Sequence, residues 1–293
     1  MFFLSSQIAF AVILDHSSMA PRYKQFRIPS DSQGIVYDQF NIETKPRLYL
    51  DGALHYLSDL KSPISGETCL VYGSNPKSLP KICELVEVAD LRLAATHCAD
   101  LSPLQRIRRL RNLQIRWNTK LIDLEAIGCL ANLELLVLQS TQKITDIAPL
   151  GKLKHLEILE IDSGMWNVIK LKSLDPLNEL PKLEELYLCG IRSSKNGLKP
   201  LAKCHSLRYL ALPNKFPMED YAFLSASLVN VTSPHFQPWV PLKVNGVDYC
   251  VFLTKGIGAL DPTVDSDRIQ KLEIKFRHLQ SKFAAEIARQ PTM

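Results

Sequence analysis

An apolar string of the form LxxLxxLxL returns at steps of 21 to 27 residues between Leu48 and Val231 of this chain. A period of roughly 20–50 residues is typical of repeat architectures, and neither a helical bundle nor a doubly wound sheet requires one. Weaker copies of the string lie at Leu48/Leu50 and Leu70/Tyr72 and around Val231. The strong copies end in the pairs Leu91/Leu93, Leu113/Ile115, Leu136/Leu138, Leu159/Ile161, Leu186/Leu188 and Leu210/Leu212.

The spacing within each copy predicts two kinds of local structure. LxL has a period of two, so both apolar side chains point to the same side of a short strand. The LxxL steps on either side suit a short helical or irregular return segment. One repeat cannot bury its own apolar face, whereas stacked neighbours can. The sequence therefore predicts an α/β solenoid with a parallel sheet on its concave face and short convex segments.

Four segments between the strands carry a family resemblance. ADLSPL, IDLEAI, TDIAPL and SLDPL resemble the short leucine-rich repeats, about 22 residues long, of internalins and phosphatase regulatory subunits. The resemblance implies a right-handed solenoid that binds other proteins. That family usually places Asn three residues after the second strand leucine. Here only Asn118 does so, and we expect a less regular coil; the other positions hold Thr96, Thr141, Gly164, Ile191 and Lys215.

The chain divides into four parts on this interpretation. Residues 1–22 are a disordered tail, a mis-set start or a signal, and residues 23–47 form an N-terminal cap. Residues 48–232 form the solenoid, and 233–293 a hairpin followed by an amphipathic helix that caps its end. The dipeptide Asn245-Gly246 predicts the hairpin turn. The helix carries an apolar stripe that lies on the last repeat or, alternatively, pairs in a weak homodimer; its members are Ile269, Leu272, Phe276, Leu279, Phe283 and Ile287.

The first 14 residues leave the location open. MFFLSSQIAFAVIL is apolar, but no Lys or Arg precedes it, and it is shorter than the ~20 residues of a membrane span. Met19 is an alternative start. Seven cysteines without a CxxC pair favour reduced thiols. We therefore expect a cytoplasmic protein without a membrane partner, or a secreted one if residues 1–14 act as a signal peptide.

No catalytic or metal-binding motif is present. Nucleotide-binding, hydrolase and zinc signatures are all missing, so we expect no enzyme, cofactor or metal site. The net charge of +5 is small for a nucleic-acid binder. The basic string QRIRRLRN, with Arg106, Arg108, Arg109 and Arg111, is a solvated face or alternatively a patch for an acidic partner.

The candidate binding residues are those that alternate with the strand leucines, because alternation turns them to the concave face. Apolar and aromatic centres with charged surroundings are typical of binding surfaces. Alternatively, the N- or C-terminal tail folds across this face and covers it. An insertion also places Met165 and Trp166 on a loop, as a binding hot spot or a plug over the core. The predicted protein-binding residues are Arg92, Arg116, Leu135, Val137, Ile158, Glu160, Asp162, Glu185, Tyr187 and Tyr209.

These features predict a non-enzymatic protein–protein interaction module, or scaffold, whose concave face contacts a protein partner. One alternative is a regulator or inhibitor of a specific enzyme that uses the same face. Another is a secreted or surface adhesion protein of the internalin kind.

Overall fold

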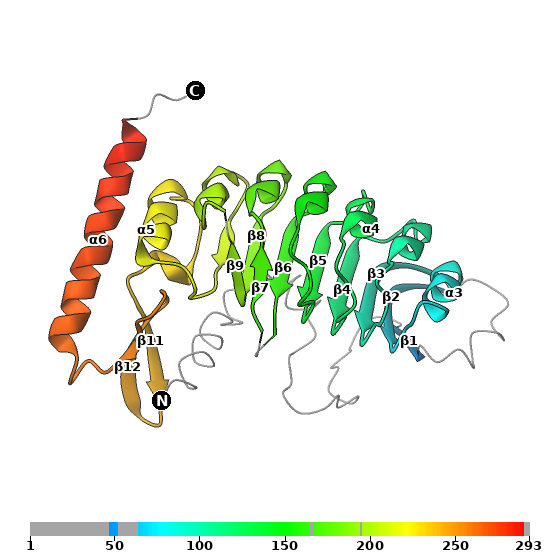
Figure 1. Ribbon diagram of the computed structural model, residues 1–293, viewed down its shortest axis with the longest axis horizontal. Helices are drawn as coiled ribbons and strands as arrows, with labels where there is room; N and C mark the ends of the chain where they lie inside the picture. The colour runs from blue at the N-terminus through cyan, green and yellow to red at the C-terminus, as the bar shows by residue number, and fades with distance from the viewer. Residues whose placement is uncertain (1–46, 52–63, 165–166, 194, 290–293) are drawn as a thin grey trace.

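Eight parallel strands form one continuous sheet along the chain. The computed structural model describes residues 47–51, 64–164, 167–193 and 195–289. Figure 1 shows the strands side by side with short helical segments above them, as predicted for a solenoid. In sheet order the strands are β1 (Arg47–Asp51), β2 (Ile64–Tyr72), β3 (Val86–Ala94), β4 (Asn112–Arg116), β5 (Leu135–Gln139), β6 (Ile158–Asp162), β8 (Glu185–Cys189) and β10 (Tyr209–Ala211).

The strand leucines stack in register from one repeat to the next. Leu113 pairs with Leu136, Leu136 with Leu159, and Leu159 with Leu186. All four side chains are completely buried. Because full burial of a Leu contributes roughly 1.5–3 kcal/mol, these columns are the main cohesive element of the solenoid. The predicted fold class is confirmed.

Short helical segments return the chain along the convex side. The acidic residue in the ADLSPL-type motifs accepts a backbone N–H at the start of the segment, as Asp100 does from Ser102 (2.8 Å) and Asp146 from Ala148 (2.9 Å). Asp100, Asp123 and Asp146 therefore accept a backbone N–H at the start of a helical turn, and in SLDPL the hydroxyl of Ser173 accepts the N–H of Asp175 instead. The segments are α3 (Ser78–Leu85), η2 (Ser102–Arg106), α4 (Glu125–Gly128), η3 (Ala148–Lys152), η4 (Asp175–Glu179) and η5 (Lys199–Lys203).

Asn118 does what the family asparagine is expected to do. Its side-chain nitrogen donates to the carbonyl of Cys98 (2.8 Å), and its side-chain oxygen accepts from the N–H of Lys120 and Leu121. In the neighbouring repeat, the Thr96 hydroxyl instead contacts the hydroxyl of Ser74 (2.9 Å). The ladder therefore changes chemistry along the solenoid.

A second, two-stranded parallel sheet lies on the flank that follows the concave strands. It consists of β7 (Ile169–Leu171) and β9 (Ile191–Ser193), and the sequence analysis did not predict it. Lys170 and Arg192 are direct neighbours in its register. Met165 and Trp166 lie outside the described residues.

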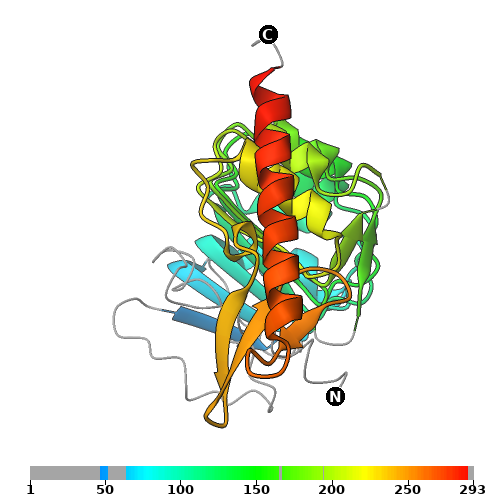
Figure 2. The same cartoon turned by 90° about the vertical axis from the view of Figure 1, so that its left-hand side faces the viewer.

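The C-terminal part closes one end of the solenoid. The predicted hairpin is confirmed, with Asn245 and Gly246 at φ 49° and 84°, and a short third strand joins it. Figures 1 and 2 show the last helix lying lengthwise over this end. The elements are α5 (Met218–Ser227), η6 (Pro234–Phe236), β11 (Val240–Val244), β12 (Val247–Phe252), β13 (Gly258–Leu260) and α6 (Ser266–Ala288).

The apolar stripe of α6 packs on the chain's own core. Phe276 is buried, and the Phe283 ring meets that of Phe223 edge-on at 5.6 Å. Gln280 donates to the hydroxyl of Ser225 on α5 (2.9 Å). The stripe therefore packs against the end of the solenoid and covers its core. Dimerisation through this helix stays a prediction. None of the described helices is both long and apolar enough to cross a membrane.

Candidate interaction surface on the concave sheet

The structure brings all ten predicted binding residues together on one face of the large sheet. They occupy three rows that run across the strands. One row passes from Arg92 through Gln114, Val137 and Glu160 to Tyr187. The second contains Arg116, Gln139 and Asp162. The third contains Asn112, Leu135, Ile158, Glu185 and Tyr209.

Most of these side chains are buried within the chain itself. Every predicted residue except Glu185 is buried, and Glu160 has no exposed surface at all. Strand alternation correctly gave the face to which they point. Alternation carries no information about what packs on that face. Their assignment as partner contacts stays a prediction.

At the tyrosine end, the C-terminal sheet covers the concave face. Val251 and Leu253 of β12 join one apolar cluster with Tyr187 and Tyr209, whose ring centroids lie 5.3 Å apart. The hydroxyl of Tyr187 donates to the Glu185 carboxylate (2.6 Å). Burial, followed by this hydrogen bond, raises the pKa of Tyr187. At this end, the alternative that a terminal segment covers the face holds.

The middle of the face contains a buried polar chain. The Gln114 amide donates to Gln139 (3.3 Å), and the Gln139 amide donates to Glu160 (3.0 Å). Burial raises the pKa of Glu160 well above its usual range, and the nearby Asp162 raises it further. Asp162 accepts the N–H of Gly164 (2.8 Å). Arginines lie on β3 and β4 and carboxylates on β6, so basic and acidic side chains lie on opposite sides of β5.

Each turn of the solenoid therefore holds one LxL strand on the concave side, one capped helical return, and side chains stacked in register with the next turn. The chain has a leucine-rich-repeat fold. No protein-family model matches the sequence, and no curated protein matches it either.

Solved leucine-rich-repeat proteins resemble the chain at low sequence identity. An internalin, InlF, of Listeria monocytogenes is 19% identical over 59% of this chain and 46% of that chain, with a TM-score of 0.43. Internalin C2 of the same organism is 25% identical over 60% of this chain and 72% of its own, with a TM-score of 0.42. A leucine-rich-repeat protein of Leptospira interrogans is 20% identical over 57% and 47%, with a TM-score of 0.42. The chain thus spans less than half of two of these three.

Trp117 is a candidate contact that the sequence analysis missed. It directly follows β4, at the rim of the concave sheet, and 37% of its side chain is exposed. The guanidinium of Arg116 lies 4.4 Å from the centre of its ring. Trp117 has a φ of 55°, although bulky residues rarely adopt left-handed backbone. The residues at the equivalent positions in other repeats are small: Gly73, Ala95, Ser140 and Gly190. An alignment of the repeats at the position just after each strand would therefore have revealed the tryptophan.

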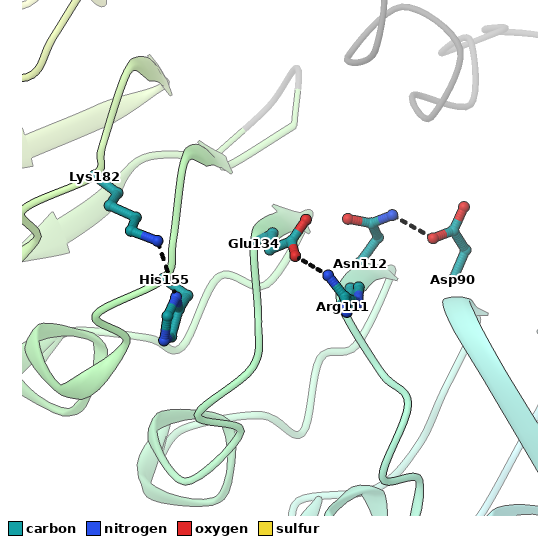
Figure 3. Close-up of polar contacts among 6 residues, drawn as sticks. All are labelled: Asp90, Arg111, Asn112, Glu134, His155 and Lys182. Atoms are coloured by element: carbon teal, nitrogen blue, oxygen red, sulfur yellow. Dashed lines mark hydrogen bonds and ion pairs between the residues drawn. The ribbon is translucent and has the colours of Figure 1, made fainter.

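Polar contacts link successive leucine-rich repeats at the opposite edge, where the strands begin (Figure 3). Asn112 donates to Asp90, Arg111 pairs with Glu134 at 2.6 Å, and Lys182 lies 3.1 Å from the His155 ring. These contacts are inter-repeat links.

The basic string QRIRRLRN divides between two roles in the structure. Arg106 pairs with Glu84 of the preceding repeat, and Arg111 pairs with Glu134 of the next. Arg108 and Arg109 are exposed. Half of the string therefore belongs to the inter-repeat contacts, and the other half is on the solvated flank.

Most of the described thiols of the leucine-rich-repeat chain are buried. Burial raises the pKa of Cys69, Cys83 and Cys204 to about 12, which keeps these thiols protonated and unreactive. Cys189, the last residue of β8, is buried in the tyrosine cluster. Across the described ranges, no three His, Cys, Asp or Glu side chains are grouped as metal ligands would be.

Proposed function

We propose that this leucine-rich-repeat solenoid is a non-enzymatic protein-interaction module that contacts one protein partner through the concave face between β3 and β6. The observation that carries the proposal is the row of polar and charged side chains on that face. It runs from Arg92 and Arg116 through two glutamines to Glu160 and Asp162.

A sheet face that only packs against its own chain needs no such row. Moving a charged group out of water costs several kcal/mol even after relaxation, and apolar side chains of similar volume would serve packing better. Charges across an interface chiefly select the partner and its orientation. The concave row therefore has the chemistry of recognition.

The charges also specify the partner's chemistry. Because neighbouring strands are ~4.8 Å apart, Arg116 on β4 and Asp162 on β6 are separated by roughly 10 Å along the sheet. A partner segment that lies across the strands would place an acidic group over the arginines and a donor over the carboxylates. Trp117, at the arginine end, offers it an exposed aromatic contact.

The apolar residues of the face form one buried cluster. Leu135, Val137 and Ile158 lie at its side next to the polar row. Tyr187 and Tyr209, with Glu185, lie at the end that the C-terminal sheet covers, so a partner reaches them only if that sheet moves away. We assign the main contact to the polar half because it carries the charged side chains and adjoins the exposed Trp117.

The test uses the partner itself. Affinity capture with residues 19–293 from lysate of the source cell, followed by mass spectrometry, supplies a candidate, and titration calorimetry with the purified candidate measures its affinity. Trp117→Ser copies the residue that the next repeat carries at the same position, Ser140, so the fold is retained. We expect it to weaken binding by tenfold or more, as for an aromatic hot spot worth ≥ ~2 kcal/mol.

Two further variants locate the surface. Glu160→Gln together with Asp162→Asn keeps side-chain shape and removes the carboxylates, and we expect a clear loss of affinity. Ile122→Ser removes an exposed apolar side chain from the return segment of the same repeat, and should have no effect. Unchanged affinity in both Trp117→Ser and the double variant would show that the concave face is not the site.

A further inference from the structure

Four cations form an unbroken column along the flank that follows the concave strands. Lys120 and Lys143 each lie four residues beyond a strand end, and those ends, Arg116 and Gln139, are register partners. The Lys172 N–H bonds the Thr145 carbonyl (2.8 Å), which places Lys170 beside Lys143. Lys170 and Arg192 are neighbours in the β7–β9 sheet.

All four cationic side chains are exposed. Within the described part of the chain, none of them forms an ion pair or a side-chain hydrogen bond. Cations two or three residues farther along the same flank behave differently, since Lys172 pairs with Asp146 (2.9 Å) and Lys195 with Asp175 (3.8 Å). On this flank, the column cations thus lack the carboxylate partners that Lys172 and Lys195 have.

No structural task accounts for the column. The aspartates of the neighbouring column cap helical turns, and backbone N–H groups lower the pKa of Asp100 and Asp146. The cations cap no turn and only flank buried residues such as Leu121, Ile144 and Leu171. Like charges on adjacent strands destabilise a sheet. A solvated repeat surface would be expected to mix signs, as the column of Arg111, Glu134, Glu157, Glu184 and Arg208 does.

We propose that this column, Lys120, Lys143, Lys170 and Arg192, is a second interaction surface that binds an acidic segment of a protein. At a strand spacing of ~4.8 Å the column is roughly 14 Å long, which an extended run of five or six residues covers. Charge complementarity sets the partner's chemistry, namely a run of Asp and Glu.

Single-stranded nucleic acid fits this surface less well. Proteins that bind it usually combine a basic groove with aromatic side chains on which bases stack. Among the described residues beside these cations in the sequence, Thr119, Ile122, Gln142 and Thr145 are polar or aliphatic, and the exposed Trp117, near Lys120, supplies a single aromatic side chain. A protein carboxylate needs only the cations.

This surface is separate from the concave face and does not depend on the function proposed for it. Its test requires no identified partner. The probe is a fluorescein-labelled octaglutamate peptide, titrated with the full chain at 50 mM salt and followed by fluorescence anisotropy. We expect saturable binding that weakens as salt increases.

Two quadruple variants remove equal charge from opposite flanks. The first is Lys120→Gln, Lys143→Gln, Lys170→Gln and Arg192→Gln. The matched control is Arg108→Gln, Arg109→Gln, Lys182→Gln and Lys203→Gln. We expect the first to bind octaglutamate at least tenfold more weakly and the control to stay within twofold of the natural chain. The midpoint of thermal unfolding of the first should stay the same or increase, because repulsion is relieved.

Several results would overturn the proposal. One is that the natural chain fails to bind the peptide up to 1 mM, on the order of the weakest affinity a specific site would show. Another is that both variants lose binding equally, since the effect would then be one of net charge. Tighter binding of an oligouridylate of equal length, lost in the first variant, would assign the column to nucleic acid instead.

Discussion

Residues directly after five of the concave strands, β2, β3, β4, β5 and β8, adopt left-handed backbone, and three of the five are not glycine. Ala95 has a φ of 52° and Ser140 one of 54°, whereas Gly73 and Gly190 hold the same place in other repeats. The N–H of Ala95 bonds the carbonyl of Arg116 in the next repeat (3.0 Å). The left-handed turn thus extends the hydrogen-bond ladder by one residue, at a conformational cost wherever a side chain is present.

Ala95→Gly should therefore stabilise the chain. Left-handed backbone costs an L-residue about 1–2 kcal/mol, and the added freedom of the unfolded chain offsets about 0.4–1 kcal/mol of this. We expect a net gain of about 0.5–1 kcal/mol in the free energy of unfolding, measured by urea denaturation. Ala94→Gly, one residue earlier in β3, is the control and should destabilise. A loss of stability in both variants would contradict this explanation.

His235 gives the C-terminal end a dependence on pH. Its ring stacks on Tyr221 at 5.2 Å, and burial lowers its pKa to about 3. The unfolded chain binds a proton at this residue below pH ~6.5, whereas the folded chain does so only near pH 3. Stability contributed by neutral His235 is therefore complete above pH ~6.5 and decreases as pH falls.

The free energy of unfolding should decrease by about 1.4 kcal/mol per pH unit between pH ~6 and pH ~3.5, which amounts to a loss of about 2 kcal/mol at pH 5. His235→Phe retains a ring on Tyr221 and should remove that component from urea unfolding curves measured between pH 7 and pH 4. His205→Phe, at an exposed position, should leave the component intact. An unchanged slope in His235→Phe would show that other groups set the pH dependence.

At the scale of the element, α6 closes the solenoid with one face and leaves the other in solvent. Phe276 is 3% exposed and belongs to the main core, whereas Ile274, two residues earlier, is 60% exposed. Substitutions at these two positions therefore distinguish the contribution of core packing, which only Phe276 makes, from that of helix propensity, which both residues affect.

Phe276→Ala should cost about 3–5 kcal/mol, because it removes a buried ring and leaves a cavity beneath α6. Ile274→Ala should change the free energy of unfolding by less than about 0.5 kcal/mol. Thermal unfolding followed by circular dichroism measures both. Similar losses in the two variants would mean that α6 does not cap the core.

Element prediction from the sequence succeeded where periodicity was long and failed where it was short. The Asn245-Gly246 turn and the six-member stripe of α6 were legible from composition and spacing alone. The three-residue strands β7, β9 and β13 were missed, whereas β10, also of three residues, was predicted because it belongs to the repeat. Each of the three missed strands is defined by its hydrogen bonds to a neighbouring strand, β7 with β9 and β13 with β12. The local sequence pattern does not specify which segment will be that neighbour.

At the scale of the whole molecule, each repeat contacts mainly the repeats beside it. A destabilising substitution in one repeat should therefore chiefly destabilise the adjacent repeats. Leu159→Ala in β6 should cost about 2–5 kcal/mol. Native-state hydrogen exchange should show lost protection chiefly in β5, β6 and β8, and less in β2 and β3. Val229→Ala, at an exposed position, is the control. Equal loss along all strands would show a single cooperative unit.

The face to which the candidate residues point was predictable from the sequence, whereas the segments that pack on that face were not. Alternation with the strand leucines placed Arg92, Glu160 and Tyr187 on the concave face. That β12 returns over Tyr187 could not be read from the sequence, because a contact between residues more than 60 positions apart has no local signature. Trp117 and the cation column lie outside the leucine framework, and comparison of repeats position by position is what reveals them.

The return of β12 over Tyr209 also sets an order of events during synthesis. Val251 leaves the ribosome about 40 residues after Tyr209, a delay of roughly 2–8 s at usual translation speeds. If the last turn folds within that interval, its tyrosines are not yet covered. The nascent protein therefore offers chaperones an aromatic patch that the finished protein hides, and a transcript cut short before β12 would yield a product marked by that patch for removal.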